Sequence, residues 1–423
     1  MKKIFFPLLL GLSLAHAQTP PESSCLICHR QLEAELLAPV TAWANDIHAG
    51  SGLGCESCHG GNPSPAVADD PEAAMSRAAG YRGKPARTSI PRLCASCHSD
   101  PAVIKKYNPA LPTDQLASYR TSRHGELLFQ KGDDKVAVCS DCHGSHGILA
   151  AGDSRSPVYP LNVPATCGRC HADAGYMAGY GIGVGQVADY EASVHGEALL
   201  RKRDTAAPAC NDCHGNHGAI PPEVKNISHV CGRCHFNNAG LFARSPHAQP
   251  FEEMGLAQCE TCHGNHNITA PTDARLDPTG SEFACGSCHE PESAGWKNGA
   301  EMFAILHAMK SKIATADSLV RRAERAGMEV SEAKFIISAA NDELIKARTQ
   351  VHTFRSALLQ ERSKTGVDLA NQAVGLGRAA LQELQYRRQG LAVSMVIIFA
   401  VAAALYAKIR RKDREWQQSQ ERG

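Results

Sequence analysis

The strongest constraint on this chain is a five-residue pattern, Cys-x-x-Cys-His, that recurs along its first 290 residues. The pattern occurs nine times in 423 residues, and its cysteines account for all 18 cysteines of the chain. No cysteine is left over for a disulfide, a free nucleophile or a four-cysteine zinc site. The copies are numbered motif 1 to motif 9 in chain order: Cys25–His29, Cys55–His59, Cys94–His98, Cys139–His143, Cys167–His171, Cys210–His214, Cys231–His235, Cys259–His263 and Cys285–His289.

The residue types of each motif suit covalent attachment of a c-type haem. Two thiols at this spacing can both add to the vinyl groups of one porphyrin, and the next imidazole is then placed to ligate its iron. A zinc knuckle or a thioredoxin-like redox pair would explain one isolated copy, but neither explains nine copies that use every cysteine. We therefore predict nine covalently bound c-type haems. The predicted thioether cysteines are Cys25, Cys28, Cys55, Cys58, Cys94, Cys97, Cys139, Cys142, Cys167, Cys170, Cys210, Cys213, Cys231, Cys234, Cys259, Cys262, Cys285 and Cys288. The predicted proximal iron ligands are His29, His59, His98, His143, His171, His214, His235, His263 and His289.

An internal repeat predicts the distal ligands, which bind iron on the other face of each haem. Each repeat opens with a histidine, continues with one motif and a histidine three residues after it, and ends with a second motif. The opening histidines are His48, His124, His195 and His247, and the histidines after the first motif are His146, His217 and His266. The second group lies too close in sequence to its own proximal histidine to reach the opposite face of that haem. We therefore expect each of these histidines to ligate a neighbouring haem. The first repeat has Gly60-Gly61-Asn62-Pro63 in place of this histidine.

Two further distal ligands are needed if every iron has two histidines. The candidates are His229, His307 and His352. His229 lies outside the repeat pattern, so we assign His307 and His352, which would attach a C-terminal helical region to the haems. The alternatives are that His229 replaces one of them or that one or both are surface histidines. Nothing in the pattern favours Met177 or Met254 as ligands.

Residues 300–390 contain no cysteine or proline, and their apolar residues recur at intervals of four and three, as in packed helices. The three apolar series run from Met302 to Ala323, from Ile337 to Leu358 and from Val367 to Leu384. We expect breaks at Gly327–Val330 and at Ser363–Gly366. The predicted fold is mainly α with extensive loops: a haem-packed domain over 18–290 and an antiparallel three-helix bundle over 300–390. The bundle would act as a stalk and offers a surface for a homodimer.

Both ends of the chain predict export and membrane anchoring. Residues 1–17 have the basic start, apolar stretch and Ala-x-Ala end of a signal peptide. Residues 391–409 form an apolar stretch long enough for one transmembrane helix. More basic residues follow this stretch than precede it, which predicts a cytoplasmic tail over 410–423. The haem domain would then lie in the periplasm, on the bacterial inner membrane. Lys and Arg are scattered through the haem region, so we expect no nucleic-acid partner.

Residues 190–235 contain Y-x-x-S-x-H-G-x-A-L, then C-x-D-C-H-G-x-H-G, then C-G-x-C-H. This run resembles membrane-anchored members of the multihaem cytochrome c superfamily, the cytochrome c3-like proteins with doubled haem motifs. The resemblance extends over 25–290. It implies electron transfer between the quinone pool and periplasmic or extracellular electron acceptors. It also implies an inner-membrane partner, a cytochrome b-type or quinol-oxidising subunit.

Iron with two histidine ligands has no open position for a substrate, so we predict an electron-transfer subunit with no catalytic residue rather than a stand-alone enzyme. The alternative is a multihaem oxidoreductase of the nitrite, hydroxylamine or tetrathionate type, which needs one haem with an open coordination position. A haem-rich structural or assembly protein is the third class. Spectroscopy of the oxidised iron separates the first two, because an open position gives a high-spin signal.

Overall fold

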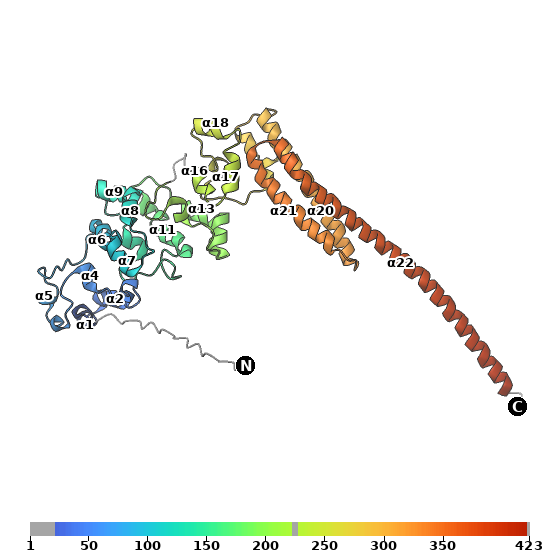
Figure 1. Ribbon diagram of the computed structural model, residues 1–423, viewed down its shortest axis with the longest axis horizontal. Helices are drawn as coiled ribbons and strands as arrows, with labels where there is room; N and C mark the ends of the chain where they lie inside the picture. The colour runs from blue at the N-terminus through green and yellow to red at the C-terminus, as the bar shows by residue number, and fades with distance from the viewer. Residues whose placement is uncertain (1–21, 222–226, 421–423) are drawn as a thin grey trace, which may run out of the picture. The chain divides into compact units, whose positions relative to one another are not determined.

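The computed structural model describes residues 22–221 and 227–420, and these residues form helices, turns and loops without a β-strand (Figure 1). The mainly α fold predicted from the sequence is therefore confirmed. The predicted signal peptide lies outside the described residues. The chain divides into two compact units, unit 1 (Met1–Glu223 with His263–Ala270) and unit 2 (Val224–Cys262 with Pro271–Gly423). The boundary therefore falls inside the region that carries the haem motifs.

Unit 1 consists of short helices joined by long loops. Its small apolar clusters are each built around a few residues, such as Tyr190 and Leu199 or Trp43 and Leu26. The α-helices are α1 (Ser24–His29), α2 (Ala34–Trp43), α3 (Ile47–Gly50), α4 (Cys55–His59), α5 (Pro71–Ala74), α6 (Ile90–His98), α7 (Pro101–Tyr107), α8 (Gln115–Thr121), α9 (Arg123–Lys131), α10 (Cys139–His143), α11 (Val163–His171), α12 (Ala174–Met177), α13 (Gln186–Ala192), α14 (Val194–Gly196) and α15 (Cys210–His214). Four further single turns are η1 (Pro65–Val67), η2 (Arg87–Ser89), η3 (Pro160–Asn162) and the π-helical η4 (Glu197–Arg201).

The haem motifs of unit 1 occupy two kinds of helix. Motifs 2, 4 and 6 form five-residue helices, α4, α10 and α15, each followed by a glycine with positive φ. That backbone conformation is available to glycine at low cost and ends the helix directly after the motif histidine. Motifs 3 and 5 end nine-residue helices, α6 and α11, that begin with a proline in the first turn. The doubled motifs of the sequence therefore correspond to alternating short and long helices.

Unit 2 joins a second set of short elements to a long helical bundle. The short elements are α16 (Ile227–Gly232), α17 (Phe236–Phe242), α18 (Ala248–Glu253), α19 (Glu260–His263, whose last residue belongs to unit 1), η6 (Asp273–Leu276), η7 (Ala284–Ser287) and η8 (Val351–Thr353). The bundle comprises α20 (Ala294–Arg325), α21 (Ser331–Gln350) and α22 (Ser356–Gln420). These three helices pack side by side in Figure 1.

The bundle core confirms the first heptad series of the sequence, whereas the second series is interrupted by a turn and its last residue, Leu358, is exposed. All seven residues of the first predicted series, from Met302 to Ala323, are buried. The predicted break at Gly327–Val330 is also present, because α20 ends at Arg325 and α21 begins at Ser331. The predicted break at Ser363–Gly366 is wrong. The chain turns instead at Val351–Arg355, where Phe354 adopts positive φ, and Asn298 of α20 binds the turn through the carbonyl of Phe354 and the N–H of Ser356.

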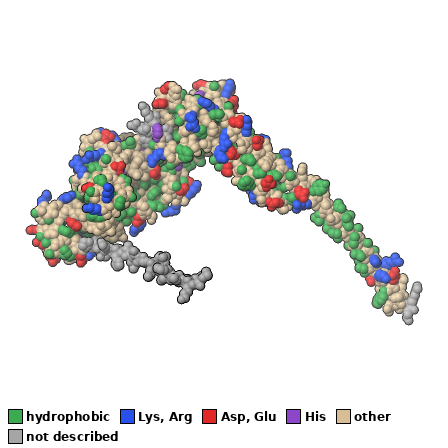
Figure 2. All heavy atoms as spheres, viewed as in Figure 1, with side chains coloured by type: hydrophobic (Ala, Val, Ile, Leu, Met, Phe, Trp, Pro, Cys, Tyr) green, Lys and Arg blue, Asp and Glu red, His purple; other side chains and the backbone are tan. Residues whose placement is uncertain are grey.

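The C-terminal part of α22 is apolar on all sides. Ile397 and Phe399 are 59% and 65% exposed, and α22 is long and apolar enough to cross a membrane. Figure 2 shows hydrophobic side chains covering this stretch and a group of Lys and Arg side chains beyond it. The predicted span over 391–409 lies wholly within this helix.

Candidate haem-attachment sites

The opening histidine of each central repeat is held by the same set of local contacts. In the second repeat, the Ser122 hydroxyl accepts a hydrogen bond from the Gly125 N–H at 2.9 Å and donates one to the Tyr119 carbonyl at 2.6 Å. The Tyr119 hydroxyl donates to the carbonyl of Ala137, just before motif 4, at 2.7 Å. A side chain at Gly125 would collide with the Tyr119 carbonyl, which explains the glycine. The third repeat has the same contacts at Tyr190, Ser193, Gly196 and Pro208.

Backbone hydrogen bonds join the opening histidines of the first three repeats to a histidine loop of the following repeat. The donor is the N–H of the residue directly before the opening histidine. The acceptor is a carbonyl of the following repeat, two residues after the histidine that follows its first motif. The three bonds run from Ile47 to Ile148, from Arg123 to Ala219 and from Val194 to Ile268, at 2.8, 3.1 and 2.8 Å. Because the same bond recurs three times, the repeats are held in one register within unit 1.

Six pairs of predicted ligands face each other across gaps of one size. Two imidazoles that bind one iron from opposite faces, with each nitrogen about 2 Å from the metal, place their ring centres about 6 Å apart. In the part of the chain that the structure describes, six proximal histidines have a second histidine ring at 5.8 to 6.1 Å. The pairs are His48 with His98, His59 with His146, His124 with His171, His143 with His217, His214 with His266, and His247 with His289.

The pairs follow a rule that the sequence did not reveal. The opening histidines His48, His124 and His247 face the proximal histidine of the second motif in their own repeat, as His124 faces His171. Each histidine after a motif faces the proximal histidine two motifs earlier in the chain, as His217 of the motif 6 loop faces His143 of motif 4. The sequence predicted a neighbouring haem for these histidines without identifying its motif, and the structure places them opposite the motif next but one in the chain.

The ring Nδ1 of several predicted ligands is hydrogen-bonded to a backbone carbonyl. The Nδ1 atoms of His59, His214 and His352 lie 3.0, 3.1 and 3.0 Å from the carbonyls of Gly83, Ile220 and Thr349. A carbonyl can only accept, so Nδ1 carries the proton and Nε2 is the ring nitrogen with the lone pair that a metal would need. His48 has a stronger partner, because its Nδ1 donates to the buried carboxylate of Asp46 at 2.9 Å.

Burial keeps these imidazoles in the form that binds iron. Burial lowers the pKa of seven of the paired histidines, and a neighbouring histidine lowers the pKa of most of them further. The seven are His98, His124, His143, His146, His171, His217 and His247. A ligating histidine must be neutral, so these sites are set for metal binding at neutral pH.

The cysteines show that consecutive motifs are spatial neighbours within each unit. The first cysteines of two consecutive motifs lie in hydrogen-bond contact in four couples: Cys25 with Cys55, Cys94 with Cys139, Cys167 with Cys210, and Cys231 with Cys259. Between couples, Cys58 lies within electrostatic range of Cys94 and Cys97. Cys142 has the same relation to Cys167 and Cys170, and Cys262 to Cys288. Motifs 1 to 6 are therefore contiguous in unit 1.

The remaining predicted ligands have varied surroundings. His195 stands in α14 as His124 stands in α9, and His352 is half-buried beside the bundle, where burial and then the nearby His235 lower its pKa. His307 is exposed on α20 with its ring against Phe303, and His229 is exposed on α16. In the described part of unit 1, His29 donates toward the Leu36 carbonyl and no second histidine ring faces it.

Comparisons with known proteins agree with this arrangement. Residues 47–174 match the cytochrome c3 family. The "C-type polyheme cytochrome OmcC" of Geobacter sulfurreducens is 27% identical over 183 residues, which is 37% of this chain and 21% of that protein. This chain therefore matches only about a fifth of its relative's length. No solved structure matches the chain.

The chain is a multihaem c-type cytochrome. The family match covers the region in which motif helices α4, α6, α10 and α11 alternate, so the alignment and the geometry identify the same repeats. In this cytochrome the sequence predicted the ligand types. It did not indicate the residues that orient them, such as Asp46 and Tyr119. The recurring Tyr and Ser before each central opening histidine were the available signal.

Proposed function

We propose that this cytochrome binds nine c-type haems and carries electrons along them. Each motif contributes two thioether cysteines and a proximal histidine. The observation that supports the proposal best is the set of six facing histidine pairs, which supply two imidazoles to one iron. Iron with two imidazole ligands is low-spin, has no open position, and changes oxidation state with little rearrangement. Such haems suit electron transfer rather than substrate chemistry.

The proposed distal ligands are the nine histidines predicted from the sequence. Ring pairs support six of them: His48, His124, His146, His217, His247 and His266. His195 is supported by the contacts that its repeat shares with His124. His352 is supported by its burial and by its position near His235. His307 is assigned from the sequence pattern alone, with His229 as its alternative.

The proposed route of the electrons follows the chain order of the motifs within each unit. Neighbouring cysteines link motif 1 to motif 2 and so on to motif 6, and they link motifs 7, 8 and 9 in unit 2. The cysteine side chain is the covalent attachment point of each porphyrin edge, so contact between cysteines of two motifs implies close approach of two porphyrins. Close approach of porphyrin edges is what permits rapid transfer.

We further propose that the haem domain is periplasmic and anchored by α22. The apolar surface of α22 and the basic residues after it support one transmembrane span with a cytoplasmic C-terminus. A quinol-oxidising cytochrome b-type subunit in the same membrane is the proposed electron donor or acceptor at one end. Periplasmic or extracellular redox proteins are the proposed partners at the other end.

Haem counting and low-temperature EPR of the oxidised holoprotein test this proposal. Mass spectrometry should give nine haems per chain, and EPR should show low-spin ferric signals with no binding of carbon monoxide after reduction. A high-spin ferric component of about one haem in nine would contradict the pure carrier role and support the oxidoreductase alternative. The haem of motif 1 is the first to test for such a signal, by comparing a Cys25→Ala/Cys28→Ala variant with the unaltered chain.

A further inference from the structure

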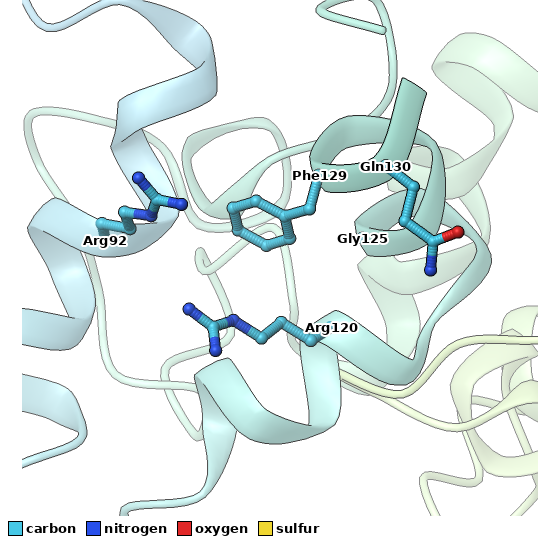
Figure 3. Close-up of a pocket in the computed structure, with 5 residues that line it drawn as sticks. All are labelled: Arg92, Arg120, Gly125, Phe129 and Gln130. Atoms are coloured by element: carbon cyan, nitrogen blue, oxygen red, sulfur yellow. The ribbon is translucent and has the colours of Figure 1, made fainter. Parts of the chain in front are cut away.

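Two arginines and one aromatic ring line a hollow on unit 1 beside the haem motifs. The hollow has a volume of about 380 Å³ and is lined by Arg92, Arg120, Gly125, Phe129 and Gln130 (Figure 3). The guanidinium carbons of Arg92 and Arg120 lie 5.6 and 5.4 Å from the centre of the same Phe129 ring. In Figure 3 both guanidinium groups extend from their helices toward this ring.

The ring is held in place by the fold rather than by the arginines. Phe129 packs edge-on against Tyr119 with a centroid distance of 6.0 Å. Tyr119 is itself buried and bonded to the carbonyl of Ala137. The hollow therefore has a fixed apolar floor, and its charged side chains converge from two separate helices, α6 and α8.

Among the described residues, the guanidinium groups of Arg92 and Arg120 have no carboxylate in a salt bridge with them, unlike those of Arg87 and Arg123. Arg87 is paired with Asp141 at 2.7 Å, and Arg123 is paired with Glu126 at 2.6 Å. Arg92 and Arg120 have the Phe129 ring as their shared neighbour. Two positive charges that converge without an anion repel each other, and water screens that repulsion only in part. A bound anion would replace the repulsion by two charge-assisted hydrogen bonds.

We propose that Arg92 and Arg120 form a carboxylate-binding site above Phe129. A carboxylate matches the planar donor groups of arginine, and an apolar body attached to it would lie on the ring. Two kinds of group carry such a carboxylate: a haem propionate and a free aromatic acid. The choice of a haem propionate rests on the proposed haem loading.

The position of the site gives it a consequence for electron transfer. Arg92 lies two residues before Cys94 of motif 3, and Phe129 lies one turn after His124, which faces His171 of motif 5. A guanidinium group near a haem favours the reduced iron, because it offsets the negative charge of the added electron. The arginine pair is therefore expected to raise the reduction potential of a nearby haem.

The test compares Arg92→Gln, Arg120→Gln and the double variant with the unaltered holoprotein. Arg123→Gln is the matched control, because Arg123 is a nearby exposed arginine that is already neutralised by Glu126. Haem content is measured first, so that failure of haem loading is distinguished from failure of this site. Two readouts follow: a potentiometric titration of the haems and calorimetric binding of benzoate at low ionic strength.

Each result has a definite meaning. A fall in the potential of one haem in both single variants, with a larger fall in the double variant and none in Arg123→Gln, identifies a propionate as the occupant. Benzoate binding that weakens more than tenfold in Arg120→Gln but not in Arg123→Gln identifies a site for a free acid, and this readout does not depend on the haems. The proposal would be overturned if the haem potentials are unchanged in the variants and benzoate binding does not depend on Arg92 or Arg120.

Discussion

At the scale of single residues, Asp46 joins the ring of His48 to the backbone of a distant loop. Its buried carboxylate accepts hydrogen bonds from the ring Nδ1 and the N–H of His48, at 2.9 and 2.8 Å, and from the N–H of Ile148 at 2.7 Å. A carboxylate that accepts from a ligating imidazole makes that imidazole a stronger electron donor to iron and favours the ferric state. Asp46→Asn should therefore raise the reduction potential of one haem by on the order of tens of millivolts.

Potentiometric titration of the holoprotein measures this shift. Asp70→Asn is a suitable control, because Asp70 caps the N-terminus of α5 through the N–H of Ala73 and has no histidine partner. An equal shift in both variants, or no shift in Asp46→Asn, would show that Asp46 does not act through His48. Asp46→Asn should also lower the free energy of unfolding by about 1–3 kcal/mol, because one of its hydrogen-bond partners loses a good acceptor.

Gly125 is the residue that most directly tests the loop that holds His124. A methyl group at this position would overlap the Tyr119 carbonyl and displace the Ser122 cap, because all three are in contact. Gly125→Ala should destabilise unit 1 by about 1–3 kcal/mol and convert one haem from low-spin to high-spin. Urea denaturation and EPR are the two measurements. Gly179→Ala, at a turn position with open space around it, should leave both unchanged.

At the scale of elements, the bundle shows which helix features the sequence reveals. The buried series from Met302 to Ala323 could be predicted, because a period of 3.5 residues identifies the face that packs. The turn after α21 could not. Ser363 and Gly366 resemble a helix break in the sequence, but both are buried inside α22 where the helices approach closely. Small residues at such a contact and small residues at a turn have the same composition, and only the packing distinguishes them.

This distinction predicts opposite effects for two glycines of α22. A side chain at Gly366 would press on Met309 and on the Cβ of Glu343, which would lie only 3.0 Å away, whereas Gly375 has open space around it. Gly366→Leu should lower the free energy of unfolding by about 1–3 kcal/mol. Gly375→Leu should raise it by up to about 1 kcal/mol, because leucine is the better helix former. Urea denaturation followed by circular dichroism checks both, and a gain in stability from Gly366→Leu would contradict the packing of α22.

Asp273 connects η6 to the bundle and gives it a pH dependence. Two hydrogen bonds from Arg348, at 2.9 and 2.8 Å, lower the pKa of Asp273, with Lys310 adding to the effect. A lowered pKa means that the ionised form stabilises the fold above about pH 4 and that this stability is lost as the pH falls. The contribution should be about 1 kcal/mol, since the basic partners are partly exposed. Asp273→Asn should reduce the loss of stability between neutral pH and pH 3, while Asp317→Asn on the exposed side of α20 should not.

At the scale of the whole molecule, the sequence predicted the candidate haem ligands but not which histidines face each other. Spacing predicts His146 and His217 as ligands, because each follows a motif at the same distance. Their partners are set by backbone hydrogen bonds such as that from Ile47 to Ile148, which joins residues about a hundred positions apart. No local pattern encodes such a bond, so the next-but-one rule emerged only from the fold. The family match over 47–174 covers the first two repeats and leaves the later repeats, the bundle and α22 outside it.

The bundle and the apolar part of α22 have separable roles, and this separation predicts the outcome of truncation. The buried residues of α22 end at Gly377, whereas the exposed apolar stretch begins at Leu391. Removal of all residues after Gly390 should therefore leave the bundle folded and the haem content unchanged, but release the protein from the membrane fraction into the soluble fraction. Truncation after Asp413 retains the span and the basic residues beside it, so that variant should stay in the membrane fraction. Fractionation with a haem stain measures both. Retention of the first variant in membranes would show that another part of the chain, or a membrane partner bound to the haem domain, also anchors the protein.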